Sequence, residues 1–508
     1  MNEEIAEYYE ELYRLYIDEN QPLERRYRQL RESLERVVRE RIQGNSLQTT
    51  DLAARINYVA TQYGLDLKEQ NQLHTFRLTS NDILNHRKFP AKEEFLRDLR
   101  AVAFAYRKMF AQDIPLKLFS VLPKQEITSL GKKEKKEYIR RIRVCFDYAD
   151  DTYLYVHPVD IIADEPIRVV YNKPGINHEF EETIKELWRY AQLNLLDVFV
   201  DREGIYTPSF IVLEPDYLID ISSLAECYKD YGSHPANYFL SRLVPIDNAR
   251  PLLLGNIANL FLDEWIHAGE EEPDYIDCMK KAFRQYPIEL AACAELRDPS
   301  KEKEFAKDCR MHFEHIRDVV QHTFLEPGYN LDKKEAVLEP SYICEALGIQ
   351  GRLDYMQRDM SSFIEMKSGK ADEFSMQGKV EPKENNKVQM LLYMAVLEYS
   401  MGQDRRRMHP YLLYTRYPLL YPARASWAQV RRVINLRNRI VAAEYGVQFH
   451  NHPDFTRNLL AQINPEVVNE RKLSGRFWEQ YLKPSISRFR EKLSALEPLE
   501  QAYFYTLY

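Results

Sequence analysis

The stretch GRLDYMQRDMSSFIEMKSGK, residues 351–370, decides how the rest of this sequence is interpreted. Its pattern predicts a β-hairpin, with IQGRLDYM as one strand, QRDM near the turn and SSFIEMKSG as the partner strand. Side chains alternate along a strand, so Glu365 and Lys367 should share a face with Phe363, while Ile364 and Met366 point to the other side. We therefore expect the apolar pair in the core and the charged pair in a cleft.

Asp354, Glu365 and Lys367 form a chemically complete set for hydrolysing a phosphodiester. Two neighbouring carboxylates repel each other unless a divalent cation bridges them, and hard cations such as Mg²⁺ and Mn²⁺ prefer such oxygen ligands. A lysine beside the pair offsets charge that develops on a phosphate and assists an attacking water. The alternative is a solvated hairpin in which Glu365 and Lys367 form a weak surface ion pair.

A second polar pair follows 22 residues after Lys367, in the segment QMLLY that runs from Gln389 to Tyr393. The surrounding sequence KVQMLLYMAVLEYSM predicts a helix, on which residues four apart lie on one face. Gln389 and Tyr393 would then present an amide and a hydroxyl together to a phosphate or an attacking water. The alternative is a surface pair beside the apolar stripe of an ordinary helix.

The order G-x-x-D, then E-x-K on the next strand, then Q-x-x-x-Y on the following helix resembles the PD-(D/E)xK nucleases of the RecB type, over roughly residues 220 to 440. The resemblance implies an α/β fold with a restriction-endonuclease-like core, in which helices flank a mixed central sheet. It implies Mg²⁺ or Mn²⁺ as the cofactor and Lys367 as the catalytic lysine. The metal ligands would be Asp354, Glu365 and the backbone carbonyl of Met366, and Gln389 and Tyr393 would contact the DNA strand.

The sequence departs from this family at the upstream G-x-x-x-H motif, whose histidine binds metal in many members. The best-aligned stretch is GNIAN, so Asn259 stands where the histidine is expected. Asparagine still offers a carbonyl oxygen to a hard cation, as a weaker ligand. Asp263, Glu264 and His267 are the alternatives close by.

The second departure concerns the iron–sulfur cluster that many relatives carry, which needs one upstream cysteine and three near the end of the nuclease domain. The upstream element here reads SHPANYF, from Ser233 to Phe239, and no cysteine follows Cys344. We therefore predict no cluster, and we expect reduced, buried thiols.

Length, composition and changes of pattern along the chain predict its domain organisation. At 508 residues the chain exceeds one compact core, and 45% apolar with 29% charged residues is typical of a globular protein. Pattern changes predict a helical N-terminal region over 1–125, a β-rich module over 126–220, the nuclease domain over 221–445, and a helical C-terminal region over 446–508. That last region could lead to a missing helicase domain. No uncharged run is long enough for a membrane span, which predicts a cytoplasmic protein without a membrane partner.

Net charge is −8, which argues against a protein that coats nucleic acid nonspecifically. Local charge differs, because residues 405 to 443 hold nine arginines and no Asp, Glu or Lys, interleaved with aromatic residues. Such a segment is typical of a groove that binds single-stranded nucleic acid, and equally of a basic face that interacts with acidic helices in the same chain. The predicted DNA-binding residues are Arg405, Arg406, Arg407, Arg416, Arg431, Arg432 and Arg437.

These observations predict a metal-dependent nuclease that cuts single-stranded, flap or end DNA in repair, recombination, replication or phage defence. No G-x-x-x-x-G-K-[ST] phosphate loop is present, so a helicase motor would be a separate domain or subunit. One alternative is a nucleic-acid-binding or scaffolding subunit of a helicase complex with a weakened nuclease core. Another is an RNA nuclease, since nothing here distinguishes a 2′-hydroxyl.

Overall fold

The protein is described by a computed structural model that covers residues 3–42, 51–123, 137–160, 165–243, 250–374, 379–424, 426–450 and 452–507. Its contacts divide the chain into two compact units, Met1–Glu214 and Pro215–Tyr508. Both units contain helices and mixed β-sheets, so the predicted α/β class is confirmed.

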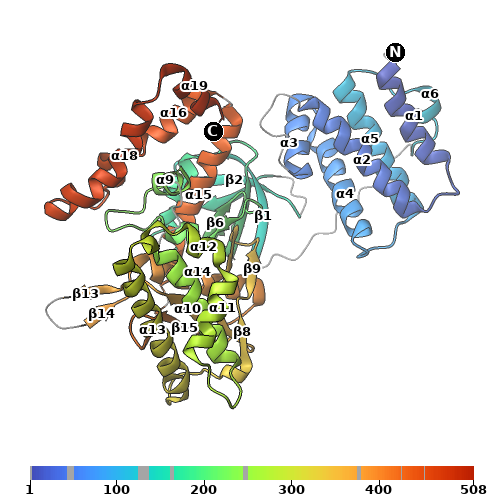
Figure 1. Ribbon diagram of the computed structural model, residues 1–508. Coiled ribbons are helices and arrows are strands. Elements are labelled where there is room, and N and C mark those ends of the chain that lie inside the picture. The colour runs from blue at the N-terminus through green and yellow to red at the C-terminus, as the bar shows by residue number, and fades with distance from the viewer. Residues whose placement is uncertain are drawn as a thin grey trace. The chain divides into compact units, whose positions relative to one another are not determined.

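The first unit begins with a group of helices whose buried faces form one aromatic-rich core. Tyr27 lies against Phe76 and Phe95 in this core, and Asp66 with Glu69 forms a capping box that fixes the start of one helix. The helices are α1 (Glu3–Ile17), α2 (Leu23–Arg41), α3 (Leu52–Gln62), α4 (Leu67–Leu84), α5 (Lys92–Phe110) and α6 (Leu116–Phe119) (Figure 1).

A small barrel follows in the same unit. Its strands are β1 (Tyr138–Ala149), β2 (Tyr153–Pro158), β3 (Ile167–Val170), β4 (Gln192–Val200), β5 (Tyr206–Thr207) and β6 (Phe210–Leu213), with α7 (Glu181–Lys185) between β3 and β4. The ring closes because β1 pairs with both β2 and β4, while β3 pairs in parallel with β5 and β5 pairs with β4. The five strands β1, β2, β3, β5 and β4 thus form a closed ring, and β6 is added at β4.

The second unit is built around a five-stranded mixed sheet in the order β16-β15-β12-β11-β8. Its strands are β8 (Ala336–Leu338), β11 (Tyr355–Gln357), β12 (Ser362–Lys367), β15 (His409–Tyr414) and β16 (Leu419–Pro422). The β12–β15 pair is parallel and the other pairs are antiparallel. A three-stranded sheet, β7 (Ile219–Asp220), β10 (Ile349–Arg352) and β9 (Ser341–Cys344), and a hairpin of β13 (Asp372–Phe374) and β14 (Lys379–Glu381) complete the strands.

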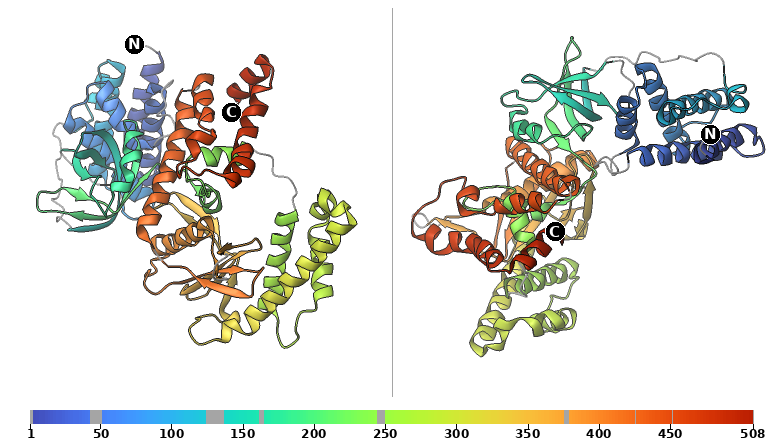
Figure 2. Two further views of the ribbon diagram at one scale, coloured as in Figure 1. Left: turned by 90° about the vertical axis from the view of Figure 1, so that its left-hand side faces the viewer. Right: turned by 90° about the horizontal axis from the view of Figure 1, so that it is seen from above.

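Helices cover the two faces of the five-stranded sheet. On one face, Ile364 and Met366 of β12 join the apolar core of α10 (Arg250–His267) and α13 (Pro299–Gln321), as the predicted alternation requires. Figure 2 shows these yellow-green helices to one side of the orange strands. On the other face, α14 (Glu384–Met401) packs on β15 and on α8 (Ile221–Ala225).

The other helices of this unit are α9 (Ala236–Leu243), α11 (Tyr275–Gln285), α12 (Pro287–Ala292), α15 (Trp427–His450), α16 (Pro453–Ala461), α17 (Pro465–Val468), α18 (Lys483–Ser494) and α19 (Pro498–Leu507). Helix α15 runs without a break across the predicted boundary at 445–446. The unit also begins before residue 221, because β7 pairs with β10. Within the described ranges, each helix is either too short or too polar to cross a lipid bilayer.

The predicted hairpin is wrong in one respect. IQGRLDYM does not form one strand, because the chain changes sheets at Leu353 and Asp354. Before this point β10 pairs with β9 and β7, and after it β11 pairs with β12. Asp354 therefore lies at the junction between the two sheets.

Candidate functional site

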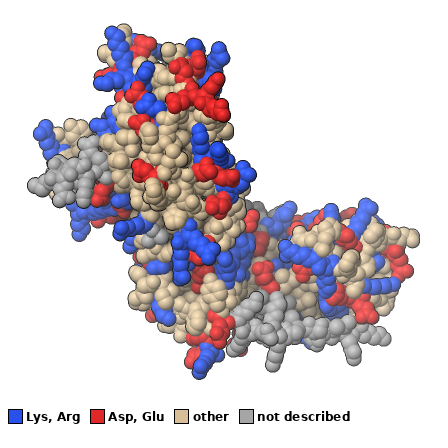
Figure 3. Space-filling view, turned by 90° about the horizontal axis from the view of Figure 1, so that it is seen from below, with Lys and Arg blue, Asp and Glu red and all other residues tan. Residues whose placement is uncertain are grey.

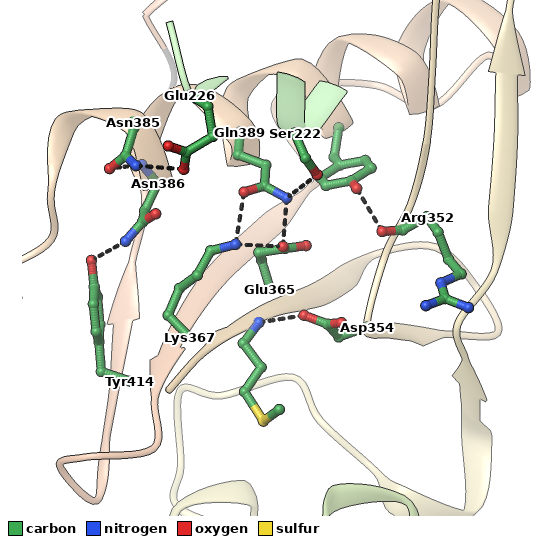
Figure 4. A network of polar contacts seen from close by, with 12 residues as sticks. Ser222, Glu226, Arg352, Asp354, Glu365, Lys367, Asn385, Asn386, Gln389 and Tyr414 are labelled. Atoms are coloured by element: carbon green, nitrogen blue, oxygen red, sulfur yellow. Dashed lines mark hydrogen bonds and ion pairs between the residues drawn. The ribbon is translucent and has the colours of Figure 1, made fainter. Parts of the chain in front are cut away.

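Strand β12 places both charged residues of the E-x-K motif on the sheet face that meets α14. Lys367 Nζ lies 2.9 Å from Glu365 Oε1, and Glu365 is only 4% exposed. Asp354 comes close from the junction before β11, where its Oδ2 accepts a hydrogen bond of 2.6 Å from the backbone N–H of Met366. The three residues predicted from the sequence are thus brought together (Figure 4).

Helix α14 supplies the residue that links the charged pair. Gln389 Oε1 accepts a hydrogen bond of 2.8 Å from Lys367 Nζ, and Gln389 Nε2 donates to Glu365 Oε1 at 2.5 Å. The same amide donates to Ser222 Oγ at 3.2 Å, which connects the network to α8. Gln389 is 4% exposed, so it is a buried member of the site and not part of a solvated helix face.

Tyr393 lies one turn further along α14, on the same face as Gln389. Its hydroxyl donates a hydrogen bond of 2.5 Å to the carbonyl of Arg352, directly before the sheet junction. A Cβ atom at Gly351 would lie 3.1 Å from the Tyr393 ring, closer than most such contacts, so glycine suits this position. Tyr393 thereby holds the end of β10, and hence the segment that carries Asp354.

Electrostatics of the three charged groups are set by burial and by one another. Burial and the neighbouring Asp354 raise the pKa of Glu365 to about 8, against the opposing effect of Lys367. Burial also raises the pKa of Asp354, although the Met366 N–H and Lys367 oppose it. For Lys367 burial lowers the pKa, but Glu365, Asp354 and Glu226 outweigh it and the pKa is raised. Lys367 is therefore a cation at neutral pH and not a proton acceptor.

The donor atoms fit a hard divalent cation. Glu365 Oε2 is buried and has no hydrogen-bond partner among the described residues, whereas its Oε1 has two. In an extended strand the N–H and C=O of one residue face the same edge, so the Met366 carbonyl lies on the Asp354 side, as its N–H does. One free carboxylate oxygen, a second carboxylate and a carbonyl are the ligand types that Mg²⁺ and Mn²⁺ accept, with water completing the shell.

Helix α10 carries Asn259, at the position where the family resemblance leads one to expect a metal-binding histidine. Gly255 lies against Ser368, directly after β12, where an added Cβ would be 3.3 Å from the Ser368 hydroxyl. Asn259 is half-buried one turn later, and Asp263 follows at the i+4 position on the same face. Burial, Glu339 and Asp354 raise the pKa of Asp263 to about 6.

The other two alternatives on α10 are engaged elsewhere. Glu264 forms an ion pair with Lys281 at 2.5 Å, and the His267 ring lies 2.9 Å from the Asp263 carbonyl. Of the residues proposed to replace the histidine, Asp263 is thus the one whose carboxylate is electrostatically coupled to Asp354.

Residues near the site that the sequence patterns did not reveal come from the region of α8 and from the residue after β8. Ser222 and Glu226 belong to α8 and the residue after it, and Asn385 Nδ2 donates to Glu226 at 3.1 Å. Glu339 follows β8 with φ of +48°, and its N–H donates to the Asp354 carbonyl at 3.1 Å. No motif marks these residues, although Asp220, which caps α8, is a helix-start signal that the predicted boundary at 220–221 separated from its helix.

The prediction that Arg437 binds DNA is wrong. This residue is fully buried, and its guanidinium donates to the carbonyls of Gly348 and Tyr217. It joins α15 to the start of the three-stranded sheet and cannot reach a phosphate in this fold.

The remaining arginines are dispersed. Arg405 lies over the Trp427 ring at 4.2 Å and pairs with Glu398 at 3.0 Å. Arg406 and Arg407 are exposed just before β15, at the end of the parallel β12–β15 pair opposite to Lys367. Arg416 is half-buried after β15, and on α15 Arg431 is half-buried and Arg432 exposed. On the face drawn in Figure 3, basic and acidic side chains are interspersed, so charge does not single out one path there.

Two further observations bear on cofactors. Across the described ranges, no group of three or more His, Cys, Asp and Glu side chains is gathered so as to hold a metal ion. A cation at this site would therefore depend on two carboxylates and the Met366 carbonyl. All six cysteines, Cys145, Cys227, Cys278, Cys293, Cys309 and Cys344, are buried thiols that form no disulfide.

No protein-family model matches this chain, and no curated protein matches it.

Proposed function

We propose that this protein is a metal-dependent DNA nuclease whose second unit is a restriction-endonuclease-like core. The observation that carries the proposal is the unpartnered, buried Glu365 Oε2 beside Asp354 and Lys367. A buried carboxylate oxygen without a partner costs free energy, and the Asp354 carboxylate makes its ionisation harder still. A site built for a divalent cation explains why both carboxylates are kept there.

Asp354, Glu365 and the Met366 carbonyl would hold Mg²⁺ or Mn²⁺. When bound, such a cation supplies a positive charge that stabilises the phosphate as negative charge builds up on it. Asp263 on α10, whose pKa is raised in part by Asp354, adds negative charge near the site, but among the described residues its carboxylate is not gathered with those of Asp354 and Glu365.

The chain's own residues have separate tasks in the proposed hydrolysis. The oxygen of a water molecule attacks phosphorus and the water gives up one proton to solvent. The bond from phosphorus to the 3′-oxygen breaks, and the released 3′-oxygen takes up a proton, so the products are a 5′-phosphate and a 3′-hydroxyl. Lys367 remains protonated, so it stabilises the developing negative charge by hydrogen bonding and does not remove the proton from water. Gln389 orients Lys367 and Glu365 toward each other, and Tyr393 positions the Asp354 segment.

Cleavage of end-labelled DNA tests the proposal. Single-stranded, duplex and forked substrates are incubated with the full chain in Mn²⁺, in Mg²⁺ and in EDTA. We expect cleavage only with a divalent cation, and a loss of at least a hundredfold in Asp354→Asn and Lys367→Met. Lys370→Met, three residues beyond the site, is the matched control and should cut like the wild type. Failure to cut any substrate, or equal rates in the two site variants and the wild type, refutes the nuclease and leaves the scaffolding alternative.

A further inference from the structure

A separate cavity of about 390 Å³ lies on the other flank of α14. Its floor is apolar, with Leu391 of α14 and Leu412 of β15 among the residues that line it. At its rim lie the side chains of Lys387 and Arg424, and Gln429 adds an amide. Tyr421 of β16 lines it as well, and the Tyr421 hydroxyl is buried without a hydrogen-bond partner among the described residues.

Sheet register relates this cavity to the carboxylates. Glu365 pairs with Leu412, and Leu412 pairs with Tyr421, so the three residues form one row across β12, β15 and β16. Residues paired across neighbouring strands point to the same face, and strands are about 4.8 Å apart, which places the Tyr421 backbone on the order of 10 Å from that of Glu365. The cavity and the carboxylates are thus neighbours on one sheet face, separated by α14.

The chemistry of the cavity fits a nucleotide. Its volume lies within the range of small-molecule pockets, and its apolar floor suits the faces of a base. An unpartnered hydroxyl and an amide suit hydrogen bonds to the edge of a base, and two basic side chains suit a phosphate. Glu381 also lies at the rim, 3.7 Å from Lys387, so Lys387 would exchange a weak, exposed ion pair for the phosphate.

We propose that this cavity, the Tyr421 pocket, binds one nucleotide of the same DNA strand whose scissile phosphate lies at Asp354 and Glu365. The inference rests on the proposed nuclease function for the identity of the ligand. The strand passes over the first turn of α14, where Lys383 is exposed. The pocket thereby fixes the register of the strand relative to the cleaved bond.

Binding in EDTA tests the pocket without any cleavage. The probe is a fluorescent oligothymidylate of about 12 nucleotides, compared with an abasic strand of the same length, by anisotropy with the full chain. We expect the wild type to bind the abasic strand about tenfold more weakly, since a buried base is worth on the order of tenfold or more. Tyr421→Ala and Tyr421→Phe should bind thymidylate more weakly, with a smaller difference between the two strands.

The controls separate the pocket from other effects. Arg424→Ala changes an exposed residue, so the variant should fold. It should weaken the binding of both strands by about the same factor, several-fold. Tyr503→Phe and Arg488→Ala, on α19 and α18, are the matched controls and should bind like the wild type. An undiminished difference between the strands in both Tyr421 variants overturns the inference, as does binding of thymidine 5′-monophosphate alone with the affinity of the oligonucleotide.

Cleavage then distinguishes this inference from the proposed function. A single abasic nucleotide placed in a longer strand should deplete one cut at a fixed offset in the wild type, and Tyr421→Ala should restore that cut. Metal-dependent cleavage without any such depletion overturns the pocket and leaves the nuclease standing. If the Tyr421 variants reduce the difference between the two strands in the binding assay but no substrate is cleaved, the nuclease proposal is overturned and the pocket stands.

Discussion

Glu365 holds one carboxylate oxygen in three-way contact with Lys367 and Gln389, and the other oxygen without a partner. Its pKa of about 8 compares with an ordinary value of 4.5, so the folded chain binds a proton between these pH values that the unfolded chain has lost. The state that binds more protons is favoured at low pH. In EDTA the free energy of unfolding should therefore fall as pH rises from about 5 to 9.

Thermal unfolding at a series of pH values measures this prediction. Glu365→Gln should flatten the fall, because the amide cannot ionise, and saturating Mn²⁺ should flatten it in the wild type, because a cation stabilises the ionised form. The isosteric control Glu295→Gln, on an exposed turn, should keep the wild-type slope. A wild-type melting temperature that rises over this pH range would show that Glu365 is not held protonated.

Gln389 is the second residue whose contribution is measurable by itself. Gln389→Ala removes an acceptor from the half-buried Lys367 and a donor from the buried Glu365, so we expect a loss of about 1–3 kcal/mol in the free energy of unfolding. Urea denaturation checks the value, with Gln285→Ala on the exposed side of α11 as the control. A loss no larger than that of the control contradicts the role of Gln389 as the link in the network.

At the scale of elements, α15 is anchored by a buried arginine. Arg437→Ala leaves the carbonyls of Gly348 and Tyr217 without their donor, and we expect a loss of about 3 kcal/mol in the free energy of unfolding. Gly348 has φ of +65°, and a side chain there would collide with the guanidinium, so Gly348→Ala should destabilise as well. Arg406→Ala, at an exposed position, should be nearly neutral. An Arg437→Ala variant of wild-type stability that binds DNA poorly would restore the original prediction.

The elements also show which features local sequence can predict. Alternation along β12 and the i, i+4 spacing on α14 are local, so the faces of Glu365, Lys367, Gln389 and Tyr393 followed from the sequence. The break at Asp354 did not, because it depends on β10 pairing with β7, more than 120 residues earlier. Ser222 enters the site through the same pairing, because α8 directly follows β7, whereas Glu339 enters through the pairing of β8 with β11. Arg437 was misjudged because charge pattern alone does not distinguish an exposed arginine from one that satisfies buried carbonyls.

At the scale of the whole molecule, the two units carry separate cores. The helical core of the first unit and the core around α10, α13 and the five-stranded sheet share no residue. Every residue of the candidate site lies after Glu214, in the second unit. We therefore expect residues 215–508, expressed alone, to fold and to retain the metal-dependent cleavage that we propose for the full chain.

Circular dichroism and the cleavage assay check this prediction on the shortened chain. A helical spectrum with cooperative melting and a cleavage rate within about tenfold of the full chain is the expected result. An unfolded or aggregated product would show that the second unit depends on the first for its stability. If residues 215–508 fold but do not cleave DNA while the full chain does, part of the catalytic site lies before residue 215.

A calorimetric titration with Mn²⁺ measures whether Glu365 and Asp354 form a cation site. We expect the wild type to bind Mn²⁺ with release of protons near pH 7, because the cation replaces the proton on Glu365. Glu365→Gln should weaken this binding by at least tenfold and abolish the proton release, whereas Glu295→Gln should change neither. Equal Mn²⁺ affinity in the wild type and Glu365→Gln, or no binding in either, would contradict this expectation.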